Sequence, residues 1–370
     1  MKVLYVGCYR DGTGWGQAAI DYILSMDAAG INVVPRPIKL NQRKYAPPRR
    51  ILELENKSSS GADICIQHTL PHYMEYTNKF KKNIALYATE TSDFKDSGWS
   101  RKINMMDEAW VINNQMVQAS KDRGVNIPVK VVPHATNIAK FERPYEKIEI
   151  PNSGAEFTFY TIADLNNRKN LEAFIRAFHT EFDPSEPVSI LIKTSAHGLE
   201  AEKTVEIVKN LCDQVKTEIK KFANPSQYKE DFIIADFIRD EDVCALHSSL
   251  DCFVTASYGE AWCIPAFDAM AFGNTPICTN IGGMSDFIGH AGFLIEGRQE
   301  PVKKMNNTFQ NIFTGKESWC SIDEIELRRV MRHVYEKRDS LDEMRKKGLE
   351  QAKEYSHEKI GSLIKGLLND

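Results

Sequence analysis

No apolar run in this 370-residue chain approaches the length of about 20 residues that a membrane-spanning helix needs. The opening residues, MKVLYVGCYRDG, read as a strand and a glycine loop, and they lack the long apolar core and cleavage site of a secretory signal. The eight cysteines are scattered and form no CxxC pair, which disfavours a disulfide framework or a zinc site. We therefore expect a cytoplasmic protein with reduced, buried thiols.

The chain also lacks internal repeats, low-complexity tracts and a recognisable metal site. The acidic run 240–242 stands at an expected helix start, where carboxylates are usually solvated and favoured by the helix dipole. The glycine-rich segment 12–16 does not have the GxGxxG spacing, because position 17 is Gln, and this disfavours a nicotinamide dehydrogenase.

Composition is typical of a globular protein, with 42% hydrophobic and 26% charged residues, and the length suits two domains better than one. The net charge of −4 is unevenly divided: residues 1–150 carry +5 and residues 151–370 carry −9. Basic clusters in the first half are Arg43-Lys44, Arg49-Arg50 and 79–82. Two interpretations stay open, a solvated surface or a first half that meets an anionic partner.

Short apolar runs alternate with helix-like segments along the chain. The expected strands are 2–7, 31–35, 63–67, 83–88, 108–112, 129–133, 156–163, 188–194, 231–235, 252–256 and 275–279. The expected helices are 17–29, 170–182, 201–222, 240–249, 325–336, 342–355 and 356–368. This alternation predicts mainly parallel sheets covered by helices on both faces.

The pattern is interrupted once, between about residues 137 and 155, where apolar periodicity is poor and a linker is expected. We therefore predict an α/β protein with two Rossmann-like domains facing across a cleft. The first comprises residues 1–140, joined by the C-terminal helix 356–370, and the second comprises residues 155–350.

The most informative stretch is 257–283, SYGEAWCIPAFDAMAFGNTPICTNIGG. Glu260 lies in the loop after strand 252–256, and Asp268 follows on a helix-like run that ends at Gly273. In a parallel sheet this loop and helix N-terminus lie at the carboxyl edge, where ligands bind and free N–H groups suit anions. The two carboxylates are suited to accept hydrogen bonds from hydroxyl groups, as on a sugar and a ribose.

Further segments accompany this stretch in a fixed order. They are GTGWG at 12–16, VVPH at 131–134, DLNNRKN at 164–170 and ILIK at 190–193. With EAWCIPAFD at 260–268, which looks like an E-x7-E signature, the chain resembles the retaining glycosyltransferases of family 4. That family has the two-Rossmann-domain architecture called GT-B, and the resemblance covers most of the chain and is strongest in its second half.

The resemblance implies transfer of a sugar from a nucleotide-sugar to an acceptor with retention at the anomeric carbon, without a metal or a cofactor. It implies that Glu260 contacts the donor sugar and that Lys169 meets the diphosphate, with Arg168 compensating for Asp164 at the usual arginine position. His68, which follows strand 63–67, is the candidate beside the reacting centre. The other candidate donor-binding residues are Gly14, Trp15, Gly16, Lys193, Ala261, Trp262, Cys263, Ile264 and Asp268.

Several of these positions have two interpretations. Asp268 stands where the family usually has Glu, so its reach to a ribose is shorter. Trp262 suits a core position or a lid, and His68 suits a structural role as well as a catalytic one. Glu90 follows an expected strand, where it is placed either to reach the cleft or to cap the next segment.

Two alternative functions stay open: a nucleotide-sugar epimerase on the same fold, and a non-catalytic sugar-nucleotide binding protein. The partner common to all three is a nucleotide-sugar. The sequence leaves the donor base, the sugar, the acceptor and the oligomeric state undetermined. The basic first half permits a polyanionic acceptor, such as an acidic glycan, a lipid surface or a modified base in DNA.

Overall fold

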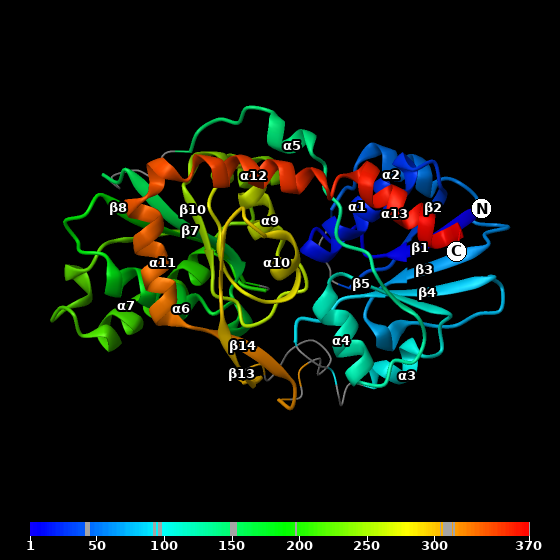
Figure 1. The fold of residues 1–370 in the computed structure, drawn as a ribbon, viewed down its shortest axis with the longest axis horizontal. Coiled ribbons are helices and arrows are strands. Elements are labelled where there is room, and N and C mark those ends of the chain that lie inside the picture. Colours follow the sequence, from blue (N-terminus) through cyan, green and yellow to red (C-terminus); the bar gives the residue numbers. More distant parts are fainter. Residues whose placement is uncertain are drawn as a thin grey trace. The chain divides into compact units, whose positions relative to one another are not determined.

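The computed structural model describes residues 1–370 except 41–44, 92–93, 95–97, 149–153, 197, 304, 306–312, 314 and 370. Two compact units divide the chain (Figure 1): unit 1 is Met1–Ile138, Asn306–Ser318 and Ala352–Asp370, and unit 2 is Ala139–Met305 and Trp319–Gln351. The basic pair Arg43-Lys44 lies outside the described residues. Among the described helices, none is both long and apolar enough to cross a membrane.

Unit 1 is built on a six-stranded parallel sheet in the order β2-β1-β3-β4-β5-β6. Its strands are β1 Lys2–Gly7, β2 Asn32–Pro37, β3 Ile64–His68, β4 Lys82–Tyr87, β5 Glu108–Val111 and β6 Val129–Val131. Its helices are α1 Gly14–Ala28, α2 Arg49–Glu55, α3 Trp99–Ile103, α4 Asn114–Asp122 and α13 His357–Asn369.

The C-terminal helix α13 packs on α1, the first helix of the chain (Figure 1). Gly361 permits this close approach, because a Cβ there would lie 2.1 Å from the carbonyl oxygen of Ser25. His357 Nε2 lies 2.8 Å from an Asp21 carboxylate oxygen and fixes the start of α13 on α1. The two ends of the sequence thus belong to one unit.

Unit 2 carries a second six-stranded sheet in the order β12-β11-β10-β7-β8-β9 and a separate pair, β13-β14. The strands are β7 Phe157–Asp164, β8 Val188–Ser195, β9 Asp231–Ile234, β10 Cys252–Thr255, β11 Ile277–Thr279, β12 Phe293–Ile295, β13 Gly297–Pro301 and β14 Ser318–Ile322. The helices are α5 Ala139–Glu142, α6 Leu171–Glu181, α7 Ala201–Ile219, α8 Asp240–Ser249, α9 Ile264–Ala271, α10 Gly282–Phe287, α11 Glu324–Glu336 and α12 Asp342–Lys353.

One hydrophobic core joins this sheet to α6, α7 and α11. Phe157 and Phe159 from β7 pack there with Phe174 and Phe178 from α6, all four at most 2% exposed. Burying an aromatic side chain of this size contributes about 1.5–3 kcal/mol each. The core therefore holds α6 firmly against β7, and with it the loop that connects them.

The predicted fold class is confirmed, and the expected strands of both sheets are present. One local expectation was wrong. Residues 14–16 form the first turn of α1 rather than a loop, because the Thr13 side chain caps the helix by accepting from Gly16 N–H at 3.1 Å. Gly282 and Gly283, at the end of the stretch 257–283, form the start of α10, and the short helix α5 lies inside the stretch expected to be a linker.

Candidate active site

Three charged side chains meet at the carboxyl edge of the unit 2 sheet. Glu260 lies in the loop between β10 and α9, and Arg168 and Lys169 lie in the 3₁₀ turn Asn167–Lys169 that follows β7. Because β7 and β10 are parallel neighbours, these two loops leave the sheet side by side. Lys169 Nζ donates to Glu260 Oε1 at 2.6 Å, and Arg168 Nη1 lies 3.1 Å from the same oxygen. The structure thus brings together three residues that the sequence placed at this edge.

Backbone contacts hold the two loops in register. Tyr258 N–H donates to the carbonyl of Arg168 at 2.8 Å, and the Asn170 side chain donates to the carbonyl of Ala256 at 3.1 Å. Asn170 has φ 48°, in the left-handed region that Asn tolerates better than most residues, and so turns the chain sharply into α6. The Arg168 guanidinium also donates to the carbonyl of Gly259.

Glu260 is strongly held in its ionised form. Burial of its side chain disfavours the carboxylate, but the charges of Lys169 and Arg168, with hydrogen bonds from Lys169 and Ser257, outweigh burial and lower the pKa of Glu260 to about 2. A carboxylate with so low a pKa carries no proton to donate at neutral pH. Glu260 is therefore suited to accept hydrogen bonds and to balance charge.

The helix that follows Glu260 begins in an unusual way. Cys263, the residue before α9, has φ 71°, a conformation that costs a residue with a Cβ about 1–2 kcal/mol. Burial raises the pKa of its thiol to about 12, with a further contribution from the Glu260 charge. The N–H groups of Cys263 and Ile264 donate to no backbone or side-chain group in the described part of the chain. They remain available for a ligand at the start of the helix.

Trp262 is a core residue in the described structure. It is 3% exposed, and its ring centroid lies 4.9 Å from that of Phe287 and 5.7 Å from that of Phe267. Gly283 makes room for it, since a Cβ there would lie 2.6 Å from the Trp262 ring. Ala261 supports the same packing, because its carbonyl accepts from Gly283 N–H at 3.0 Å.

Asp268 faces a lysine rather than an open edge. Lys140 Nζ, from α5, lies 2.8 Å and 3.0 Å from the two carboxylate oxygens, and the Asp268 side chain is 8% exposed. The ion pair fastens α5 to α9. A ribose-binding role for Asp268 stays a prediction, and it would require the ligand to compete with Lys140.

Lys193 lies on β8, two residues before the strand ends, and is 8% exposed. In register it is opposite Ile162 of β7 and Ile234 of β9. Asp164, at the position where the family has arginine, ends β7 and accepts a hydrogen bond from Ser195 at 3.2 Å. The roles of both residues stay predictions.

In unit 1 the structure brings His68 and Trp15 together. His68 ends β3, is 1% exposed, and its Nδ1 lies 2.6 Å from the hydroxyl of Tyr5. Its ring stacks on Trp15, with centroids 5.2 Å apart, and Tyr22 meets it edge-on. Burial, with a smaller contribution from His134, lowers the pKa of His68 to about 3, so the ring is neutral at physiological pH.

The other unit 1 candidates lie near these elements. Gly14 and Gly16 are in the first turn of α1, where a Cβ on Gly16 would lie 3.2 Å from the carbonyl oxygen of Cys8. Glu90 is half-buried and lies three residues beyond the end of β4 at Tyr87, and its role stays a prediction.

Four described residues of the basic clusters in unit 1 pair with acids. Arg50 pairs with Asp27 at 2.7 Å, Arg49 with Glu53 at 3.1 Å, Lys81 with Asp63 at 2.8 Å, and Lys82 with Glu108 at 3.1 Å. No group of three or more His, Cys, Asp or Glu side chains among the described residues has the arrangement of a metal site.

Sequence reasoning did not identify two features of this region. One is Lys140, which lies in the stretch read as a linker. The other is the stack of Tyr258 on Trp319, with ring centroids 4.4 Å apart and planes at 14°. Neither pair shows a local sequence pattern, because their members are distant in the chain.

Part of the chain matches a known protein family, and the whole chain resembles known structures. Residues 144–316 match the family described as "Glycosyl transferases group 1". No curated protein matches the chain. Sucrose-phosphate synthase from Thermosynechococcus elongatus superposes with a TM-score of 0.68 at 13% identity, over 100% of this chain and 98% of that one.

Two further solved structures have the same fold. HepE of Anabaena, in complex with UDP and glucose, gives a TM-score of 0.66 at 13% identity, over 100% of this chain and 99% of that one. A glycosyltransferase from Rickettsia africae gives 0.65 at 12% identity, over 99% and 97%. The chain therefore has the GT-B fold, and its match to the group 1 family covers residues 144–316.

Proposed function

We propose that this chain transfers a sugar from a nucleotide-sugar to an acceptor, with retention at the anomeric carbon, and that Arg168, Lys169 and Glu260 form the centre of its donor site. The observation that carries the proposal is the buried cluster of these three side chains at the carboxyl edge of β7 and β10. HepE of Anabaena is described in complex with UDP-glucose, which makes UDP-sugars the first donors to test.

Two cations sharing one carboxylate oxygen are suited to a diphosphate. Lys169 presents a compact charge, and Arg168 presents a planar group with several donors. The free N–H groups of Cys263 and Ile264 add donors at the start of α9, where the helix dipole also favours negative charge. Pro265 contributes none, because its nitrogen carries no hydrogen. Together these groups would stabilise the charge that develops on the leaving nucleoside diphosphate.

Glu260 would act on the sugar rather than as a proton donor. Its pKa of about 2 keeps it ionised, so its oxygens accept hydrogen bonds from sugar hydroxyl groups. Oε1 is held by the two cations, which fixes the carboxylate in place. Retention rests on the resemblance of residues 260–268 to the family signature.

The test is a thermal-shift screen of nucleotide-sugars, because a ligand that binds only the folded state raises the melting temperature. We expect at least one nucleotide-sugar to stabilise the wild type, and Lys169→Ala to abolish the shift. Lys203→Ala is the matched control, since Lys203 pairs with Glu206 on the exposed side of α7. If every nucleotide-sugar leaves the melting temperature unchanged, or shifts Lys169→Ala as much as the wild type, the proposal is wrong.

A second candidate is a non-catalytic protein that binds nucleotide-sugars. The observation in its favour is the Lys140–Asp268 ion pair, which occupies the carboxylate expected to hold the ribose. Product analysis separates the functions: donor binding without turnover on any acceptor supports the binding protein, and conversion of the donor alone supports an epimerase.

For the acceptor, a polyanion remains the prediction motivated by the charge of residues 1–150. The ion pairs of Arg49, Arg50, Lys81 and Lys82 leave these side chains partly neutralised, which weakens that prediction. Acceptor binding that falls steeply with added salt would support a polyanion, and a flat response would exclude it.

A further inference from the structure

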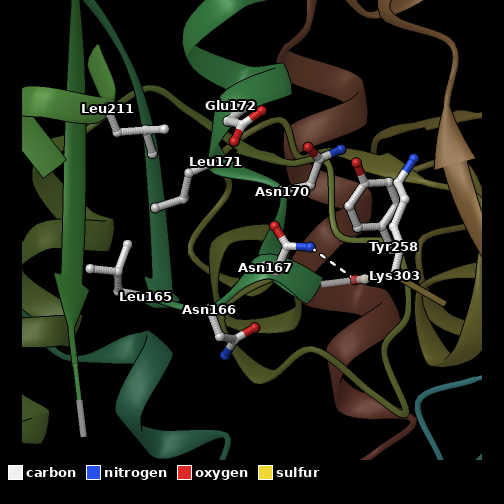
Figure 2. Close-up of a pocket in the computed structure, with 9 residues that line it drawn as sticks. All are labelled: Leu165, Asn166, Asn167, Asn170, Leu171, Glu172, Leu211, Tyr258 and Lys303. Carbon is white, nitrogen blue, oxygen red and sulfur yellow. Dashed lines mark hydrogen bonds between the residues drawn. The ribbon is translucent and has the colours of Figure 1, made fainter. Parts of the chain in front are cut away.

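A cavity of about 220 Å³ lies in unit 2 beside the first turn of α6 (Figure 2). Its lining residues are Leu165, Asn166, Asn167, Asn170, Leu171, Glu172, Leu211, Tyr258 and Lys303. None of them is among the candidate donor-site residues. The cavity shares a loop with that site, because Asn167 and Asn170 flank Arg168 and Lys169.

The cavity has an apolar wall and an aromatic one. Figure 2 shows Leu165, Leu171 and Leu211 on one side and the ring of Tyr258 on the other. Trp319 stacks behind Tyr258 at 4.4 Å, and its indole N–H donates to Glu300 at 3.2 Å. The Tyr258 ring is therefore held in position before any ligand arrives, which lowers the entropic cost of binding.

Neutral polar groups lie between the two walls. The Asn167 amide donates to the carbonyl of Lys303 at 3.1 Å, which leaves its carbonyl oxygen to accept from a ligand (Figure 2). The Asn166 side chain and the Tyr258 hydroxyl make no hydrogen bond to any other described residue. These groups offer both donors and acceptors without net charge.

The two charged lining residues are each compensated by a neighbour outside the cavity. Lys303 Nζ pairs with Glu300 at 3.0 Å, and Glu172 lies 3.7 Å from Arg176. A phosphate or carboxylate ligand would gain little electrostatic binding energy from this lining, because Lys303 and Glu172 already have partners of opposite charge. The cavity thus favours a neutral ligand with hydroxyl groups and an apolar face.

We propose that this cavity binds a single neutral sugar ring, at a site separate from the donor site at Glu260. A sugar ring has C–H faces that pack on Tyr258 and on the leucines, and a rim of hydroxyl groups that pair with asparagine amides. The volume is below the range of about 300–1,000 Å³ for sites that bury drug-sized ligands, which limits the occupant to about one ring. The proposal does not depend on transferase activity.

An occupant of this cavity would contact the same loop that carries Arg168 and Lys169. Asn167 touches the cavity directly, and Asn170 both lines it and fastens the loop to Ala256. Sugar binding and donor binding would therefore be coupled, and the coupling would be reciprocal.

The experiment measures binding of free D-glucose, D-galactose, D-mannose and N-acetyl-D-glucosamine by saturation-transfer difference NMR, with glycerol as the small polyol control. Leu211→Trp fills the cavity from α7. Leu363→Trp, at a leucine of α13 that is 39% exposed, is the matched control. We expect at least one hexose to bind the wild type. Leu211→Trp should weaken the affinity for that hexose at least tenfold, and Leu363→Trp should leave the affinity unchanged.

Two further variants keep the result decisive. Asn167→Leu removes the amide with little change in side-chain size and should weaken binding of the same hexose. This variant tests the cavity even if Leu211→Trp does not fold. Glu260→Gln alters the donor site and, through the shared loop, should weaken hexose binding less than either cavity variant does. The proposal is overturned if no hexose binds, if binding survives both cavity variants, or if Glu260→Gln weakens it more than they do, because the sugar would then occupy the donor site.

Discussion

Glu260→Gln is the most informative single change, because it removes the charge around which Arg168 and Lys169 are arranged while nearly preserving side-chain size. The variant leaves the buried Arg168 and the partly buried Lys169 without their carboxylate. Removing one partner of a buried ion pair is strongly destabilising, since the remaining charge stays desolvated. We therefore expect the loops after β7 and β10 to open more often in the variant.

The magnitude follows from the pKa of Glu260, which falls from an ordinary 4.5 to about 2. Since each unit corresponds to about 1.4 kcal/mol, the environment favours the ionised form by about 3 kcal/mol. A depressed pKa contributes stability that is fully present above about 4.5 and is lost as pH falls toward about 2. The stability difference between wild type and variant should thus be constant from pH 8 to pH 5 and shrink below that.

Hydrogen–deuterium exchange of peptides covering β10 and α9 measures this difference locally, which avoids assuming that both units unfold together. Exchange in these peptides should be about a hundredfold faster in Glu260→Gln, the factor that corresponds to about 3 kcal/mol. Glu206→Gln is the control, because Glu206 forms an exposed pair worth less than about 1 kcal/mol. Equal exchange in wild type and Glu260→Gln would refute the reasoning.

Three further predictions concern single features. Because His68 is buried with a pKa of about 3, its ring should remain neutral in an NMR titration from pH 8 to pH 5, and a midpoint near 6.5 would contradict its burial. Asp268→Asn removes the carboxylate charge that faces the Lys140 ammonium and should lower the melting temperature by several degrees, whereas the double variant Lys140→Met/Asp268→Leu should recover most of it. Gly283→Ala places a Cβ 2.6 Å from the Trp262 ring and should cost about 1–3 kcal/mol in urea unfolding, while Gly366→Ala, with nothing within 4 Å, should be neutral or stabilising.

The two-sheet fold could be predicted because buried parallel strands appear in sequence as short continuous apolar runs. The expected strand 252–256 corresponds to β10 at Cys252–Thr255, and the expected helix 240–249 corresponds to α8 at the same residues. Glu260 and Lys169 could be placed near each other for the same reason: each follows a strand, and parallel strands end at one edge.

Other features depend on contacts between distant parts of the chain. Lys140 and Asp268 are 128 residues apart, and nothing local to either residue indicates the other. The exact start of α1 was missed although its signal is local, since Thr13 is a good N-cap residue directly before Gly14. The glycines at 12–16 led to the prediction of a loop, whereas in the structure the Thr13 cap sets the start of the helix at Gly14.

The most direct test of the account is calorimetric titration of UDP and its sugars into the wild type and Lys169→Ala. The account predicts that Lys169→Ala weakens binding at least tenfold, or by about 1.4 kcal/mol, because it removes one of the two cations that face Glu260. Lys203→Ala should bind as the wild type does. Equal affinity of wild type and Lys169→Ala would contradict the assignment of the donor site to the cluster of Arg168, Lys169 and Glu260.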